Sequence, residues 1–144
     1  MQMFKALKLD DAAQVGWGVR VLLASPSGPA GHIAMRLAGL GGHVEVEAHL
    51  FDALSHLIDD PRGAQLLVID CDAYGGIEAG RRAFSILTAQ AKGIPVVLIT
   101  ADCREQTFAQ TRDAPMLLRA PVSAVALRVA FEVAFPGRRI IRAE

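Results

Sequence analysis

The chain has 144 residues, of which 52% are apolar and 21% are charged. This is the composition of a single globular domain, and it excludes a disordered protein. Fifteen Lys and Arg balance fifteen Asp and Glu, so we expect no general attraction to nucleic acid or anionic lipid. Residues 1–72 hold five basic and nine acidic residues, whereas residues 73–144 hold ten basic and six acidic ones. The later arginines include Arg112, Arg119, Arg128, Arg138, Arg139 and Arg142.

Targeting and redox signals are sparse. Neither a signal peptide nor an apolar run approaching the length of a membrane span is recognisable, so we expect a cytoplasmic protein that does not enter membranes. Cys71 and Cys103 are too few for a disulfide framework and have no zinc-ligand spacing. They follow strands that should be neighbours, so a reversible disulfide is one alternative, and two reduced, buried thiols are the more ordinary one.

The chain opens with a polar extension, residues 1–18, predicted to be weakly helical, in which Met3, Phe4, Leu7 and Val15 are spaced to form one apolar stripe. The apolar run 19–24 predicts a strand. Ser27 is placed to cap a helix over residues 29–40, which Gly41 and Gly42 end. Residues 43–48 alternate and predict an edge strand, and residues 50–59 predict an amphipathic helix.

The second half continues the alternation. Residues 66–70 are an apolar strand ending in Asp70, and a helix follows from Gly75-Gly76 to about residue 91. Residues 95–100 predict a buried strand ending in Thr100. Asp102 and Glu105 have the spacing of a capping box, which predicts a helix after this strand, although Thr107, Thr111 and Asp113 lower its propensity.

The last elements are a short strand over residues 116–119 and a helix from Ser123, its N-cap, to about residue 135. A basic tail, residues 137–144, follows. Five strands alternating with five helices predict a doubly wound α/β domain over residues 19–136, with a parallel sheet and helices on both faces. In such sheets the functional residues lie at the carboxyl ends of the strands.

These strand ends resemble the receiver domain of two-component response regulators, over about residues 19–135. The resemblance depends on the strand ending in Asp70, the strand VVLIT ending in Thr100, and Ala120-Pro121 before the final helix. The segment FDAL at 51–54 is also similar. The resemblance implies a flavodoxin-like strand order 2-1-3-4-5, a phosphoacceptor position at Asp70 and a phosphoryl-sensing position at Thr100.

The chain departs from the receiver pattern at two positions. Where receivers have an acidic pair that binds Mg²⁺, it has Ala24 and Ser25, and where they have a lysine it has Ala120. Arg119 is one residue earlier and should face the other side of the sheet, unless the register shifts by one residue. A carboxylate needs such cations to accept a phosphoryl group. We therefore expect a degenerate receiver, or pseudo-receiver, with weak Mg²⁺ binding and no other cofactor.

Other features of this rim leave alternatives open. Asp70, Asp72 and Asp102 would together form a cation site, but helix caps and turns are the commoner uses of Asp72 and Asp102. The Ser/Gly/Pro-rich loop at 25–31 would cradle a phosphate, which would make the protein a small flavodoxin-like nucleotide- or metal-binding protein. A DNA-binding regulator using the late arginines is disfavoured by the neutral net charge.

The final helix is apolar on more than one side, since Arg128 and Glu132 are its only charged residues. It needs a second burial partner, which would be either a second copy of the chain or the N-terminal segment. The sequence thus predicts a stand-alone signalling module rather than an enzyme. Its expected partners are a histidine kinase, a phosphotransfer protein or a downstream regulator, and it is expected to form a homodimer through the last helix.

Overall fold

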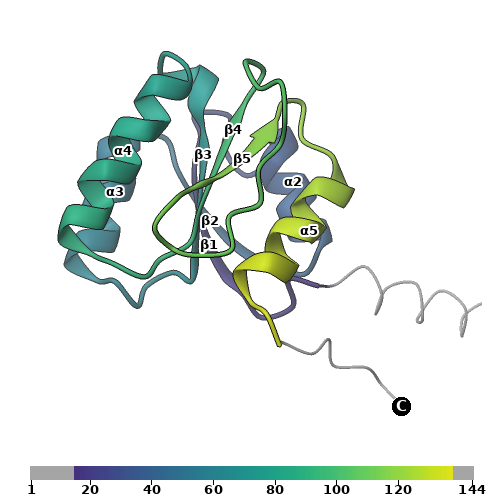
Figure 1. Ribbon diagram of the computed structural model, residues 1–144, viewed down its shortest axis with the longest axis horizontal. Helices are drawn as coiled ribbons and strands as arrows, with labels where there is room; N and C mark the ends of the chain where they lie inside the picture. The colour runs from purple at the N-terminus through teal and green to yellow at the C-terminus, as the bar shows by residue number, and fades with distance from the viewer. Residues whose placement is uncertain (1–14, 138–144) are drawn as a thin grey trace, which may run out of the picture.

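The computed structural model describes residues 15–137, which fold around one five-stranded sheet (Figure 1). Every strand pairing is parallel, and the order is β2-β1-β3-β4-β5, which confirms the predicted fold class. The strands are β1 (Arg20–Ala24), β2 (His43–Glu47), β3 (Leu66–Asp70), β4 (Val96–Thr100) and β5 (Met116–Arg119). The helices are α2 (His32–Gly39), α3 (Leu50–Asp59), α4 (Ile77–Gln90) and α5 (Ala124–Ala134), with a short 3-10 helix η1 (Cys71–Tyr74).

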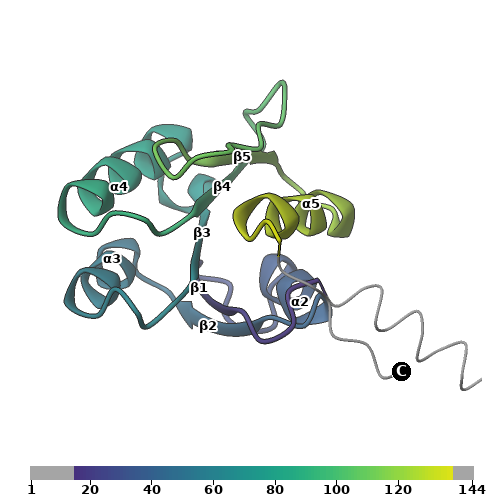
Figure 2. The same ribbon diagram turned by 60° about the horizontal axis from the view of Figure 1, so that its bottom comes forward.

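The sheet separates two hydrophobic cores. Helices α2 and α5 cover one face and α3 and α4 the other, as Figure 2 shows. Strand side chains alternate between these faces, so Val68 packs toward α2 and α5 while Leu67 and Ile69 pack toward α3 and α4. Both faces of the central strands are therefore buried, which explains their continuous apolar sequences.

The predicted helix between β4 and β5 is absent. Residues 101–115 form an irregular loop, so the expected capping box of Asp102 and Glu105 is wrong. The loop instead passes along the outer side of β5, where Thr107 and Leu117 exchange two backbone hydrogen bonds of 2.8 and 2.9 Å in an antiparallel bridge. Where five helices were predicted, the described residues hold four α-helices and the 3-10 helix.

The helix starts follow local hydrogen bonding. Ser123 accepts a hydrogen bond from the backbone N–H of Ala126 at 3.0 Å, so its predicted role as the α5 N-cap is confirmed. Ser27 does not cap α2, because the N-cap residue is Gly31 and the helix begins at His32. Gly28 has a φ of 73°, a left-handed turn that delays the helix start beyond the predicted Pro29.

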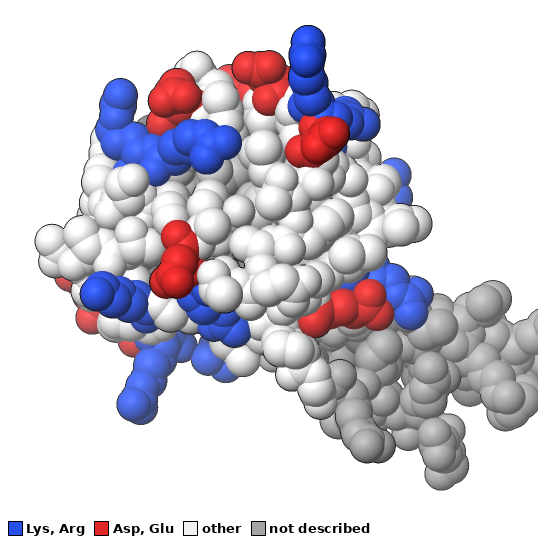
Figure 3. Space-filling view, viewed as in Figure 1, with Lys and Arg blue, Asp and Glu red and all other residues white. Residues whose placement is uncertain are grey.

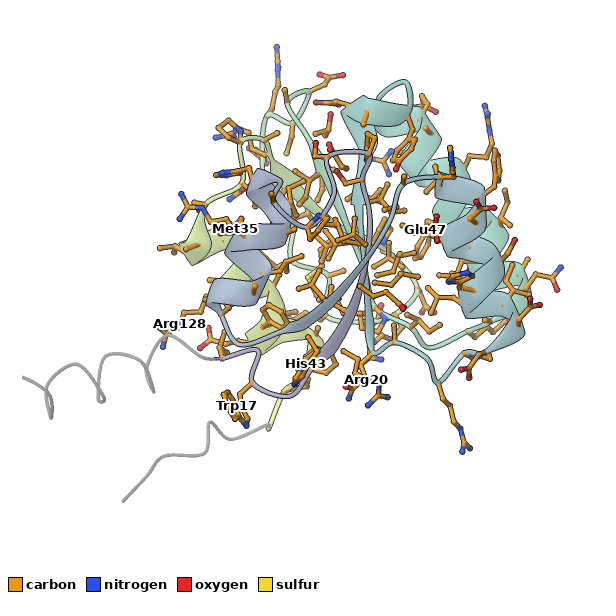
Figure 4. The ribbon with its side chains drawn as sticks, turned by 180° about the vertical axis from the view of Figure 1, so that it is seen from behind. Trp17, Arg20, Met35, His43, Glu47 and Arg128 are labelled. Carbon is orange, nitrogen blue, oxygen red and sulfur yellow. The ribbon has the colours of Figure 1, made fainter. Side chains whose placement is uncertain are left out.

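Packing begins before the predicted domain boundary at residue 19. Val15 is buried in the core on the α2–α5 side, and Gly16 donates a 2.8 Å hydrogen bond to the Leu40 carbonyl. A Cβ on Gly16 would lie 2.9 Å from the Phe131 ring, so this segment covers part of α5. Trp17 is 53% exposed beside this contact (Figure 4). Residues 1–14, with the rest of the predicted apolar stripe, and most of the basic tail lie outside the described residues.

Charged side chains of both signs are interspersed on the face shown in Figure 3, around a broad uncharged centre. Among residues 15–137, none of the helices has the length and apolarity required to cross a membrane.

Candidate functional site

The carboxyl ends of β1 and β3 bring Ser25 and Asp70 together. Ser25 directly follows β1, and Asp70 is the last residue of the neighbouring strand β3. The Ser25 hydroxyl donates a 3.1 Å hydrogen bond to Asp70 Oδ2, and its oxygen accepts a 3.2 Å bond from the Ser27 backbone N–H. Ser25 is almost fully buried, so the pair is a fixed feature of this edge.

Asp70 lines a depression of about 240 Å³ at this edge. The β1–α2 loop forms one side, and the start of the segment leading to α5 forms the other. Its described lining includes Ser25, Ser27, His32, Asp70, Ile99, Ala120 and Pro121 and contains no lysine or arginine. His32 Nε2 donates a 3.0 Å hydrogen bond to the Val122 carbonyl, so this ring nitrogen is already in use.

Burial, the largest effect, raises the pKa of the Asp70 carboxyl. The Ser25 hydroxyl lowers this pKa, and the negative charge of Asp72 raises it. The direction is opposite to that of a carboxylate held beside a cation, which would titrate below its ordinary range.

Thr100 lies at the end of β4, and its hydroxyl is bonded to Asp72 rather than to Asp70. Thr100 Oγ1 donates to Asp72 Oδ1 at 2.6 Å, and the Ala101 backbone N–H donates to Asp72 Oδ2 at 2.8 Å. The Asp102 N–H in turn donates to Thr100 Oγ1 at 3.1 Å. The predicted phosphoryl-sensing hydroxyl is therefore occupied by a carboxylate of the chain itself.

The alternative of a cation site formed by Asp70, Asp72 and Asp102 is not found. Within residues 15–137, no group of three or more acidic, histidine or cysteine side chains is arranged to hold a metal ion. Asp72 is turned toward the end of β4, Asp70 toward Ser25, and Asp102 is exposed on the loop.

Arg119 points away from the depression. It is paired with Thr100 across β4 and β5, and strand alternation puts Ala120 on the other side, where it lines the depression with Asp70. The guanidinium group of Arg119 donates to the carbonyls of Cys103, at 2.8 Å, and Arg104. Its backbone N–H donates to Gln106 Oε1 at 3.0 Å. Arg119 thus holds the loop after β4.

Ala24, the other residue at the acidic-pair position, is fully buried against the α3–α4 core.

Both cysteines are free and buried, so the disulfide alternative is not found in this structure. Burial raises the pKa of the Cys71 thiol to about 12, which keeps it protonated and unreactive at neutral pH. Cys71 is pressed against α4 at Gly80, where a Cβ would lie 2.4 Å from its Sγ.

One feature was missed by the sequence analysis. A second hollow of about 320 Å³ lies between α3 and α4, lined by His49, Leu50, Phe51, Tyr74, Ala79, Arg82 and Ala83. Phe51 is 66% exposed there, and the Tyr74 hydroxyl donates a 2.6 Å bond to the Ala48 carbonyl. The available sequence signal was Phe51, a large apolar residue that lies off the buried face of helix α3.

Comparisons with known proteins support the fold alone. No family model matches the chain, and no curated protein matches it. One similar solved structure, at 21% identity and a TM-score of 0.61, is a protein described as related to pilus assembly from Burkholderia pseudomallei, with 84% of this chain and 90% of that one covered. Another is a fusion of the yeast Spc42 trimeric coiled coil, at 19% identity and a TM-score of 0.60, with 81% and 74% covered. The parallel sheet and its strand order are those of the flavodoxin-like α/β fold class.

Proposed function

We propose that the chain is a receiver-like signalling module that acts by protein–protein contact, without phosphorylation of Asp70. The observation that carries this proposal is the composition of the depression around Asp70. Ser25 and Ala120 line it, at the positions where the receiver resemblance implies a carboxylate and an ammonium group. Among the described lining residues, no lysine or arginine supplies a cation instead.

The electrostatics of phosphoryl transfer support the proposal. A carboxylate attacking a phosphoryl donor brings two anions together, and catalysis depends on cations that neutralise the developing charge. Mg²⁺ is bound in proteins mainly through carboxylate and phosphate oxygens. The single polar side chain bonded to Asp70 is the Ser25 hydroxyl, among the contacts of the described residues. One neutral hydroxyl cannot perform the task of a divalent ion.

Exposed apolar side chains support the contact function. Phe51 lies at the hollow between α3 and α4, Met35 is 61% exposed on α2, and Val125 is 72% exposed on α5. Figure 4 shows Met35 directed away from the sheet. The proposed partners are a histidine kinase, a phosphotransfer protein or a downstream regulator, and α5 remains the proposed homodimer surface.

The flavodoxin-like nucleotide- or metal-binding alternative is favoured by one observation, the depression bounded by the loop at 25–31. The Asp70 carboxylate in its lining opposes the binding of a phosphate there. A thermal-shift screen of nucleotides and divalent ions tests this alternative, because a ligand at 100 times its Kd adds about 2.7 kcal/mol of stability.

Incubation with acetyl phosphate and Mg²⁺, followed by intact-mass measurement, tests the proposal. We expect no added phosphate, whereas a receiver with a complete site, treated in parallel, gains one. A stoichiometric phosphate that appears on the wild-type chain and is lost in Asp70→Asn would overturn the proposal. A phosphate retained in Asp70→Asn would place the modification elsewhere and leave Asp70 unmodified, as proposed.

A further inference from the structure

Two hydrogen-bond donors converge at the end of β4. The Thr100 hydroxyl and the Ala101 backbone N–H point to the same place, and each bonds one oxygen of the Asp72 carboxylate, at 2.6 and 2.8 Å. The Asp102 N–H bonds Thr100 Oγ1 from behind, which orients the hydroxyl toward the carboxylate. Thr100 and Ala101 thus form a small cradle whose two donors fit two oxygens of one oxyanion.

This cradle requires an acceptor. Thr100 is fully buried, whereas Asp72 and Ala101 are exposed. A buried hydroxyl donor without a partner is costly. Hydrogen bonds to an ionised acceptor are shorter and stronger than those between neutral groups. Asp72 supplies such an acceptor from η1, the 3-10 helix that directly follows Asp70.

The cradle is the first of a series of contacts that fix the loop at 101–115. After Ala101 and Asp102, the carbonyls of Cys103 and Arg104 accept from Arg119. Thr107 then bridges to Leu117 on the outer side of β5. Since the loop leaves β4 at Ala101, its starting direction is set by the bonds to Asp72.

We propose that Asp72 is a resident anion, which fills an oxyanion cradle formed by Thr100 and Ala101 and fixes the β4–β5 loop in one arrangement. The ligand class of the cradle is an oxyanion with two adjacent oxygens, such as a carboxylate or a phosphoryl group. One consequence rests on the proposed function: because Asp70 is not phosphorylated, the arrangement of the loop does not depend on a phosphoryl group.

Chemical rescue tests the proposal. In Asp72→Ala, the hydrogen exchange of the Ala101 amide, followed by NMR, should be at least ~tenfold faster than in the wild type, since a charge-assisted bond is lost. Sodium acetate at about 100 mM should slow it again, because a weak ligand of this size binds in the millimolar range. Sodium chloride at the same ionic strength should not slow this exchange.

Two further variants serve as controls. In Asp72→Ala/Thr100→Val, acetate should no longer slow the exchange of the Ala101 amide. In Asp102→Ala, the Ala101 amide should exchange at the wild-type rate.

Two results would overturn the proposal: unchanged Ala101 exchange in Asp72→Ala, or rescue by chloride equal to that by acetate. If Asp72→Ala does not fold, the near-isosteric Asp72→Asn replaces it. Its amide offers one acceptor oxygen, so exchange should lie above the wild type, and wild-type exchange in Asp72→Asn would show that the charge is irrelevant. These measurements use no phosphodonor. Phosphorylation of Asp70 would therefore contradict the proposed function and leave the cradle itself in place.

Discussion

Asp70 and Asp72 are two residues apart, yet their surroundings differ in kind. Asp70 faces a depression, accepts one bond from the Ser25 hydroxyl and has its pKa raised by burial. Asp72 accepts two bonds, one on each oxygen, from a buried hydroxyl and a backbone N–H. One carboxylate is poorly solvated by its neighbours, and the other is a structural member of the β4–β5 connection.

The difference shows that the donors around a carboxylate determine what it does. Asp70 occupies the position that the receiver resemblance marks for chemistry, but the β1 end gives it only Ser25. Asp72 has no role in that resemblance, and the β4 end gives it the hydroxyl assigned to phosphoryl sensing. The hydrogen-bond donors at the end of β4 therefore hold the loop at 101–115 through Asp72.

The largest effect on both carboxylates is expected from displacing the backbone segment that holds Asp70 and Asp72. Gly80→Ala would place a Cβ 2.4 Å from the Sγ of Cys71. Cys71 is the residue between Asp70 and Asp72 in the sequence. Forcing α4 away should cost about 1–3 kcal/mol of unfolding free energy, measured by urea denaturation. Gly39→Ala is the matched control, since nothing lies within 4 Å of its Cβ. It should be neutral or stabilising by less than about 1 kcal/mol. Equal effects would contradict the close packing at Cys71.

Removing the Asp72 carboxylate should have the next largest effect. Asp72→Ala leaves the Thr100 hydroxyl and the Ala101 N–H without their acceptor, which should cost about 1–2 kcal/mol of unfolding free energy. A double-mutant cycle with Thr100→Val measures how much of this belongs to the pair. Additive effects of the two substitutions would show that the hydroxyl and the carboxylate do not stabilise one another.

Asp70→Asn should be milder and depend on pH. Because the pKa of Asp70 in the folded chain lies above its ordinary value of 3.8, the folded state binds the proton more tightly than the unfolded state. Wild-type stability is therefore lost as the pH rises through the interval above 3.8. Asparagine does not ionise, so the variant should gain on the wild type from pH 4 upward, with the smallest difference below that. Unfolding curves across pH 3–7 measure the gain, and a gap that widens toward low pH would contradict the raised pKa.

Asp102→Ala should have the smallest effect. Asp102 is exposed, and its contact in the described structure is the backbone N–H that bonds Thr100, which alanine retains. We expect a change within about 0.5 kcal/mol in the unfolding free energy. A loss comparable to that of Asp72→Ala would mean that the third carboxylate also supports the β4 end.

The strands were predictable from local patterns. The apolar runs of β3 and β4 predicted buried parallel strands, and the resemblance to receivers supplied their order. The helix expected at Asp102 shows where such patterns fail. The carbonyls of Cys103 and Arg104, which would start its hydrogen-bond ladder, accept from Arg119 instead. A donor fifteen residues away in the chain cannot be recognised from a capping motif.

The candidate site was predictable in its members and not in its pairings. Asp70, Asp72 and Thr100 were all expected at the carboxyl edge, and strand alternation placed Arg119 and Ala120 on opposite sides. The partner of Thr100 depends on how η1 turns after β3, which brings Asp72 across a separation of 28 residues. Short-range spacing contains no signal for such a contact.

Trp17, the single tryptophan of the chain, has a practical consequence for work in solution. It is half-exposed at the segment where Gly16 meets Phe131, on the α2–α5 side of the sheet. Intrinsic fluorescence excited at the indole will therefore follow the attachment of that segment and remain insensitive to events at the carboxyl edge. A titration that leaves the emission spectrum unchanged is no evidence that the edge is empty.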